Sequence, residues 1–336
     1  MLKKLILFFV STILIFLALG YWAFHSPKAA AFLVRTIFNH SSPDVKLVSL
    51  YWEKHRLRWL QNAYCSGIVF ILDRDGVREN YSLKSVALKK TADFEWYIEL
   101  KDLDMESAKD AIENLNVSIL ADFKNNQLKR LKGNMEVSKM MYNRWTISNV
   151  RSEIGGGTGQ IKLINFSADC YKGKMRSEIL LDYEDKLSYI IQSELTDVDI
   201  SDLRDLSKSF FSQIEGRMNG DFKISGNSEK VISVDGFLDM ASGGMVKAAL
   251  LSQIVAYLPQ STQRKELEDL IATQGQVPLD KATVSFRNID RNQLRADMDL
   301  ESQKLNLNLN LAIDISLDTD FARLIGFNPR EAAGNH

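Results

Sequence analysis

A glycine-rich stretch, "IGGGTGQIKL" at residues 154–163, has the composition of a nucleotide-binding loop. Such a loop holds a phosphate where a helix begins directly after it, because the backbone N–H groups of the first helical turn supply the hydrogen bonds. The residues that follow here, "QIKLINFSADC", instead alternate between apolar and polar as a strand does. We therefore interpret the stretch as a sharp turn or β-bulge and expect no nucleotide site.

Two acidic stretches have spacings that could hold a cation or perform acid–base chemistry. "DISLDTD" places oxygen ligands at alternate positions, at Asp314, Ser316, Asp318 and Asp320. A calcium loop also needs a central glycine and a distal bidentate glutamate, and this stretch has neither. The stretch "LTDVDISDLRDL" contains Asp197, Asp199, Asp202 and Asp205. We interpret both stretches as solvent-facing sides of strands.

Four histidines and two cysteines are the remaining candidates for catalysis or metal binding. None of the histidines has a serine, cysteine or glutamate at the spacing of nucleophilic or zinc sites; they are His25, His40, His55 and His336. Cys65 and Cys170 are far apart in the chain and share no motif, so we expect two buried thiols, with a disulfide as the alternative. The sequence thus predicts a protein that is not an enzyme and uses no metal and no cofactor.

The overall charge argues against nucleic acid as a partner. The 336 residues include 42 basic and 43 acidic ones, for a net charge of −1, so no general basic field exists. The segment "YWEKHRLRW" at residues 51–59 does combine basic and aromatic residues. An ordinary half-buried strand explains it best, followed by contact with lipid headgroups and then by nucleic acid.

The N-terminus predicts a membrane anchor. Lys3 and Lys4 precede an apolar run from Leu5 to Phe24, which is long enough to cross a bilayer about 30 Å thick as a helix. The lysines should remain cytoplasmic, so the rest of the chain lies on the far side of the membrane. A cleaved signal peptide is the alternative. We assign residues 1–25 to the anchor and 26–44 to a short membrane-proximal helix, expected at 28–38, with a linker.

Most of the remaining chain alternates with the period of β-strands. The longest example runs from Leu305 to Leu317, where every second residue is leucine or isoleucine and would span about 44 Å as a strand. The apolar phase changes from even to odd positions at residues 301–304, which predicts a turn between two long strands. We expect one strand face to be apolar and the other polar.

Helical patterns are confined to a few segments. "DMESAKDAIENL" at residues 104–115 has helical spacing, and two helices are expected at about 245–258 and 262–273. The predicted fold class is therefore mainly β: a transmembrane helix, then a long, curved antiparallel sheet forming a groove, with a small inserted helical pair. The expected divisions are an N-terminal β region at 45–190, a C-terminal β module at 191–325 and a tail at 326–336.

The C-terminal module resembles that of the AsmA-like family of envelope proteins. The similar segments are "LTDVDISDLRDL", "FSQIEGRMNGDFKISGNSEKVISVDGFLDMASGGMVKAALLSQIVAYLP", "PLDKATVSFRN" and the closing pair of long strands. Glycines occupy positions of the kind that this pattern has, at Gly216, Gly220, Gly226, Gly236, Gly243 and Gly244. The resemblance implies an inner-membrane anchor and a periplasmic β-groove associated with phospholipid transport and outer-membrane assembly.

A long strand that is apolar on one face exposes more apolar area than a monomer usually tolerates unless something covers it. Beside a bilayer, the expected cover is a phospholipid acyl chain. The expected lipid-binding residues are Met218, Phe222, Ile224, Val284, Phe286, Met298, Leu300, Leu305, Leu307, Leu309, Leu311, Ile313, Ile315 and Leu317. The expected partners are phospholipids, the inner membrane, and an envelope protein or a second copy paired through a sheet edge. The alternative is an assembly factor that acts through protein contacts.

Overall fold

The computed structural model describes the chain with gaps. The described residues are 31, 34–36, 38–39, 45–58, 62–74, 76–124, 127–142, 145–184, 187–205, 213–227, 230–240, 242–255, 262–273, 275–290, 292–303 and 307–317. The predicted anchor at 1–25 and the tail at 326–336 lie outside these residues. Among the helices that are described, none is both long and apolar enough to cross a membrane.

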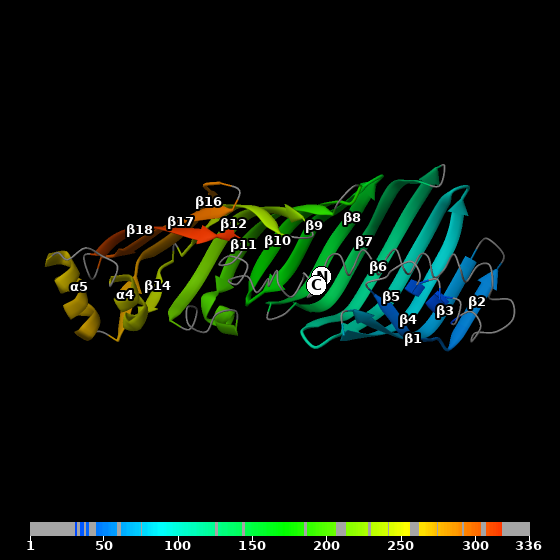
Figure 1. Cartoon of the computed structure of the whole chain (residues 1–336), viewed down its shortest axis with the longest axis horizontal. Coiled ribbons are helices and arrows are strands. Elements are labelled where there is room, and N and C mark those ends of the chain that lie inside the picture. Colours follow the sequence, from blue (N-terminus) through cyan, green and yellow to red (C-terminus); the bar gives the residue numbers. More distant parts are fainter. Residues whose placement is uncertain are drawn as a thin grey trace. The chain divides into compact units, whose positions relative to one another are not determined.

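The chain divides into two compact units. Unit 1 comprises residues 1–168 and 178–188, and unit 2 comprises residues 169–177 and 189–336. Three strands contribute residues to both units: β9 (Gln160–Cys170), β10 (Gly173–Asp182) and β11 (Ser188–Asp199), of which β11 has only Ser188 in unit 1. Both units consist mainly of long antiparallel strands, which confirms the predicted mainly-β class (Figure 1).

Unit 1 is an antiparallel meander. Its remaining strands are β1 (Lys46–Tyr51), β2 (Lys54–Arg58), β3 (Asn62–Arg74), β4 (Val77–Ala92), β5 (Glu95–Glu106), β6 (Asp110–Lys124), β7 (Gln127–Tyr142) and β8 (Trp145–Gly157). From β3 to β8 each strand pairs with the next, so these strands run side by side in chain order (Figure 1). Within the unit, β1 and β2 both pair with β3, one with each half of that strand.

Alternation places the apolar residues of these strands on one face. On β6 the buried side chains include Val117, Ile119 and Ala121, while the residues between them are partly exposed. Their Cα partners on β5 include the buried Leu100 and Ile98, so the apolar rows continue from strand to strand. The same alternation that predicted strands from the sequence therefore also selects the face of the sheet.

Four strands of unit 1 contain an interior residue with positive φ: Asp102 (48°), Asn114 (52°), Asn149 (51°) and Asn165 (53°). Asparagine and aspartate adopt this left-handed conformation more readily than other residues with a side chain. The backbone N–H of Asp102 donates to Asn116 Oδ1 at 3.1 Å, and that of Asn114 donates to Asp104 Oδ1 at 2.8 Å. The register between β5 and β6 shifts around these two residues, so both lie at β-bulges.

The helix predicted at residues 104–115 is wrong, because these residues form the β5–β6 hairpin. The Ser107 N–H donates to the Asp110 carbonyl at 2.8 Å, and the Asp110 N–H donates to Ser107 Oγ at 3.1 Å. The bulge at Asn114 then shifts the alternation by one residue. Ile112 and Leu115 are consequently both buried although they are three residues apart, a spacing that is typical of helices.

The described residues of the membrane-proximal segment are helical at 31, 34–36 and 38–39, which overlaps the helix predicted at 28–38 and passes its end by one residue. Val34 and Phe38 are buried whereas Arg35 is exposed, which is the expected amphipathic pattern. Asn39 joins this segment to β1: its Oδ1 accepts from the Leu47 N–H at 2.6 Å.

Unit 2 contains a larger and a smaller sheet. Its elements are β11 (Ser188–Asp199), η1 (Ile200–Asp205), β12 (Ile214–Asn227), β13 (Val231–Asp239), β14 (Gly244–Lys247), α4 (Ala248–Val255), α5 (Thr262–Thr273), β15 (Gln276–Leu279), β16 (Lys281–Asn288), β17 (Gln293–Ser302) and β18 (Leu307–Ser316). In the larger sheet β12 pairs with β13, β13 with β16, β16 with β17 and β17 with β18. In the smaller sheet β14 pairs with β15 and with the first residues of β12.

Two predicted elements of unit 2 correspond to β18 and α4. The described part of the strand predicted from Leu305 to Leu317 is β18, Leu307–Ser316, which pairs with β17 from Ser302 opposite Leu307 onward. This hairpin confirms the turn predicted from the change of apolar phase. Helix α4 begins at Ala248 rather than near residue 245, because residues 244–247 pair with neighbouring strands as β14.

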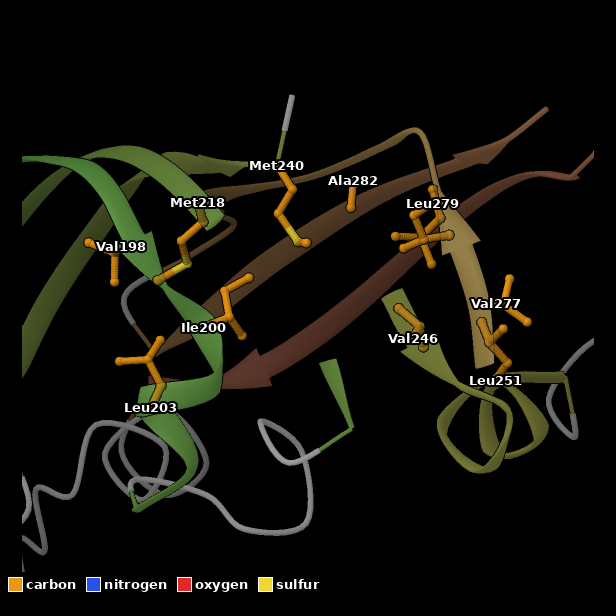
Figure 2. Close-up of a cluster of buried hydrophobic side chains, with 11 residues drawn as sticks. Val198, Ile200, Leu203, Met218, Met240, Val246, Leu251, Val277, Leu279 and Ala282 are labelled. Atoms are coloured by element: carbon orange, nitrogen blue, oxygen red, sulfur yellow. The ribbon is translucent and has the colours of Figure 1, made fainter. Parts of the chain in front are cut away.

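Unit 2 has two separate clusters of buried apolar side chains. The larger, cluster A, joins the larger sheet to η1, α4 and the smaller sheet, and Figure 2 shows its side chains converging from these elements. Its members are Val198, Ile200, Leu203, Met218, Met240, Val246, Leu251, Val277, Leu279, Ala282 and Leu300. The smaller, cluster B, consists of Val231, Val234, Leu294 and Leu317.

Candidate lipid-binding face

The glycine-rich stretch at residues 154–163 spans the end of β8, a turn and the start of β9. The strand-turn-strand interpretation is confirmed, since β9 begins at Gln160 directly after the turn. Gly159 has φ of 74°, and a Cβ on Gly156 would lie 2.4 Å from the Gln160 carbonyl oxygen. These glycines therefore permit a close approach of backbone to backbone.

The acidic residues at the end of β11 form ion pairs. Lys172 Nζ lies 3.1 Å from Asp199 Oδ2 and 3.0 Å from Asp202 Oδ2. Partial burial acts to raise the pKa of Asp199, but hydrogen bonds from Ser201 and Lys172 outweigh it and the pKa lies below its usual range. Within the described part of the chain, no group of three or more His, Cys, Asp or Glu side chains is arranged to hold a metal ion.

The polar face of β18 is exposed as predicted. Asn308, Asn310, Ala312 and Asp314 are all exposed. The Arg295 guanidinium donates to both carboxylate oxygens of Asp314, at 2.8 and 3.1 Å, and this hydrogen bonding lowers the pKa of Asp314. Asp314 is thus a partner of arginine on the solvent side of a hairpin.

Cys65 and Cys170 are free, buried thiols. Burial raises the pKa of each to about 11. Both thiols are therefore buried within their own units.

One buried acid was not anticipated from the sequence. Glu79 of β4 is fully buried, and its Oε2 accepts a hydrogen bond from the Tyr81 hydroxyl at 2.8 Å. The Tyr81 ring in turn stacks on Phe70 with ring centroids 4.5 Å apart. These contacts tie the carboxylate into the buried side of β4, and only its place in the alternating series with Tyr81 and Leu83 could have indicated this from sequence.

The residues expected to bind lipid fall into three groups. Met218 and Leu300 belong to cluster A and Leu317 to cluster B, so these three pack within the protein. Five others are half-buried: Phe222, Ile224, Val284, Phe286 and Met298. The remaining six lie in or beside β18, of which Leu305 is outside the described residues, and the others are Leu307, Leu309, Leu311, Ile313 and Ile315.

The register of β18 places the predicted residues opposite apolar positions of β17. Leu309 pairs with the buried Leu300, Leu311 with the half-buried Met298, and Ile315 with the buried Leu294. Directly opposite residues in an antiparallel pair occupy the same face of the sheet. The backbone register therefore pairs these β18 positions with apolar positions of β17.

The half-buried residues form the apolar face between clusters A and B. Phe222 of β12 pairs with Gly236 of β13, which pairs with Phe286 of β16, and Phe286 pairs with Ala296 of β17. The two phenyl rings have centroids 6.4 Å apart. Two large side chains therefore alternate with two small ones across four strands.

Gly236 and Ala296 are the residues of this face that sequence reasoning did not assign to it. A Cβ on Gly236 would lie 2.0 Å from the Asp221 carbonyl oxygen, so the site requires glycine. A glycine inside a strand often marks a close backbone approach, and this was the available signal. We define the apolar face as the half-buried residues Phe222, Ile224, Val284, Phe286 and Met298 together with Gly236 and Ala296.

Comparison of the chain with protein-family models, curated proteins and solved structures finds no match.

Proposed function

We propose that this chain is a membrane-anchored, non-enzymatic protein that binds phospholipid acyl chains on the apolar face. By this proposal it sits in the inner membrane with its N-terminus in the cytoplasm, and its β units act in the periplasm in lipid transport or outer-membrane homeostasis. The resemblance to AsmA-like proteins and the apolar run at residues 5–24 support this location.

The observation that carries the proposal is incomplete burial on the core side of a sheet. Phe222, Val284 and Phe286 share the face of the buried Met218 and Ala282, yet packing leaves them half-exposed. Apolar surface gains about 25 cal/mol for each Å² that is removed from water. An acyl chain is narrow, flexible and wholly apolar, so it fits an apolar face that lies between cluster A and cluster B.

The alternative is an assembly factor that acts through protein contacts. It is favoured by the burial of Met218, Leu300 and Leu317 in closed clusters, since part of the predicted lipid site is protein core. A partner protein or a second copy would then add a strand at β18, which pairs within its unit only with β17.

The test compares two phenylalanines on adjacent strands and opposite faces. Phe222 lies on the apolar face, and Phe237 of β13 is 45% exposed on the other. Residues 26–336 would be purified without detergent and weighed by native mass spectrometry, as the parent chain and as Phe222→Asn and Phe237→Asn. We expect bound phospholipid in the parent and Phe237→Asn and its loss in Phe222→Asn. A folded parent without lipid would favour the assembly factor.

A further inference from the structure

The first strands of unit 1 expose apolar side chains on the face that faces away from the core. Tyr51 of β1 and Val69 of β3 are Cα partners, and they are 62% and 49% exposed. Tyr64, also on β3, is 42% exposed. Val69 precedes the buried Phe70, and Tyr64 lies between the buried Ala63 and Cys65, so these side chains lie on the opposite side from the core residues.

The same strands are basic. Residues 46–58 contain four lysines and arginines and one acidic residue, in a chain whose net charge is −1. Lys46 and Lys54 are exposed, and Arg56 is the Cα partner of Tyr64. Tyrosine beside lysine and arginine is the combination that favours the headgroup layer of a membrane, where an amphipathic ring and a cation are both accommodated.

The strands that carry this surface follow the apolar run at residues 5–24 after a short connection. The hydrogen bond between Asn39 and Leu47 at 2.6 Å joins the membrane-proximal helical residues to β1. The connection from Phe24 to Asn39 is then 15 residues, which reach at most about 50 Å when fully extended. A tether of this length keeps the surface at a high effective concentration near any bilayer that holds residues 5–24.

We propose that the basic aromatic face, formed by Tyr51, Tyr64 and Val69 with Lys46 and Lys54, rests on the headgroups of an anionic phospholipid bilayer. This contact would orient unit 1 at the membrane. The inference rests on the membrane attachment in the proposed function but not on lipid binding by the apolar face.

The test uses the full chain in lipid nanodiscs. A single cysteine at Tyr51→Cys carries an environment-sensitive fluorophore, with Phe237→Cys as the control. Cys65 and Cys170 stay unlabelled in the folded protein because they are buried. Headgroup-depth spin-labelled lipids should quench the probe at 51 and not at 237, and more strongly in discs with phosphatidylglycerol than in pure phosphatidylcholine.

Charge reversal separates a specific contact from simple proximity. Lys46→Glu with Lys54→Glu should reduce quenching at 51, since each basic residue near an anionic surface contributes about fivefold to partitioning. The matched control reverses two exposed lysines of unit 2, Lys223→Glu with Lys281→Glu, and should change nothing.

Three results would overturn the inference. A chain that does not enter the discs contradicts the anchor and this proposal together. A chain that enters but leaves the probe at 51 as accessible to aqueous iodide as the probe at 237 contradicts this proposal alone. Protection of the probe by a single-stranded oligonucleotide without lipid would identify a nucleic-acid surface instead.

Discussion

At the scale of single residues, burial controls the chemistry of the two thiols. Cys65 and Cys170 have few polar neighbours to stabilise a thiolate, so desolvation raises the pKa of each to about 11. The thiolate is the reactive form, and at neutral pH little of it exists in the folded chain. These residues therefore behave as small apolar side chains.

We predict that neither thiol reacts with a water-soluble disulfide reagent at pH 7.5 until the protein unfolds in urea. The pKa in the unfolded chain is about 8.5. Since the folded pKa is higher, the stability contributed by burial is fully present below pH 8.5 (about the unfolded pKa) and is lost as the pH rises toward 11. Absorbance of the released thiol measures this, and fast labelling without urea would contradict the burial.

The pair Phe222 and Phe237 shows why side-chain identity alone does not define a binding residue. Phe222 and Phe237 occupy adjacent strands of one sheet, and Phe222 faces the apolar side. Phe237 has Asp221 as its Cα partner, and Asp235 and Asp239 lie two residues before and after it on the same strand face. A phenylalanine in the second setting has no apolar neighbours to complete a lipid site. This difference makes the two residues a matched pair for experiments.

At the scale of elements, a glycine and an alanine lie between the large side chains of the apolar face. Gly236 sits between Phe222 and Phe286 in the register of three strands. Its missing Cβ allows the backbone of Asp221 and Phe222 to approach closely.

We predict that Gly236→Ala destabilises the protein by more than about 2 kcal/mol, because its Cβ would overlap the Asp221 carbonyl oxygen. The matched control is Gly275→Ala, where an added Cβ meets nothing within 4 Å. Urea unfolding followed by circular dichroism measures both. Equal midpoints for the two variants would show that the strand shifts to accept the methyl group.

The elements also show what the sequence could and could not predict. Regular alternation identified most strands, including β18 and its turn from β17, because period two is unambiguous over many residues. It failed at the β5–β6 hairpin, where the bulge at Asn114 changes the period locally. It also failed at Gly244–Lys247, whose pairing partners are distant in the chain and cannot be seen from local pattern.

The candidate site was predicted in part for the same reason. Alternation correctly grouped Phe222, Val284, Phe286 and Met298 on one face. It could not tell them from Met218 and Leu300, since only the docking of η1, α4 and the smaller sheet covers those two. Burial by a distant element is a property of the tertiary structure.

At the scale of the whole molecule, we propose that one chain carries an anchor, a membrane-facing surface and a lipid-binding face. The anchor and the basic aromatic face would hold unit 1 at the bilayer, and the apolar face belongs to unit 2. By the proposed function, lipid would move because apolar surface is available to it outside the membrane, a step for which no catalytic group is required.

The central claim is that the apolar face holds acyl chains, and photo-crosslinking in the full-length chain in cells tests it most directly. A photoreactive phenylalanine analogue replaces Phe222 or, as control, Phe237, and lipid attached after irradiation is identified by mass spectrometry of the purified protein. The account predicts phospholipid adducts at 222 and none at 237. Adducts at neither position, or protein adducts alone at 222, would contradict it.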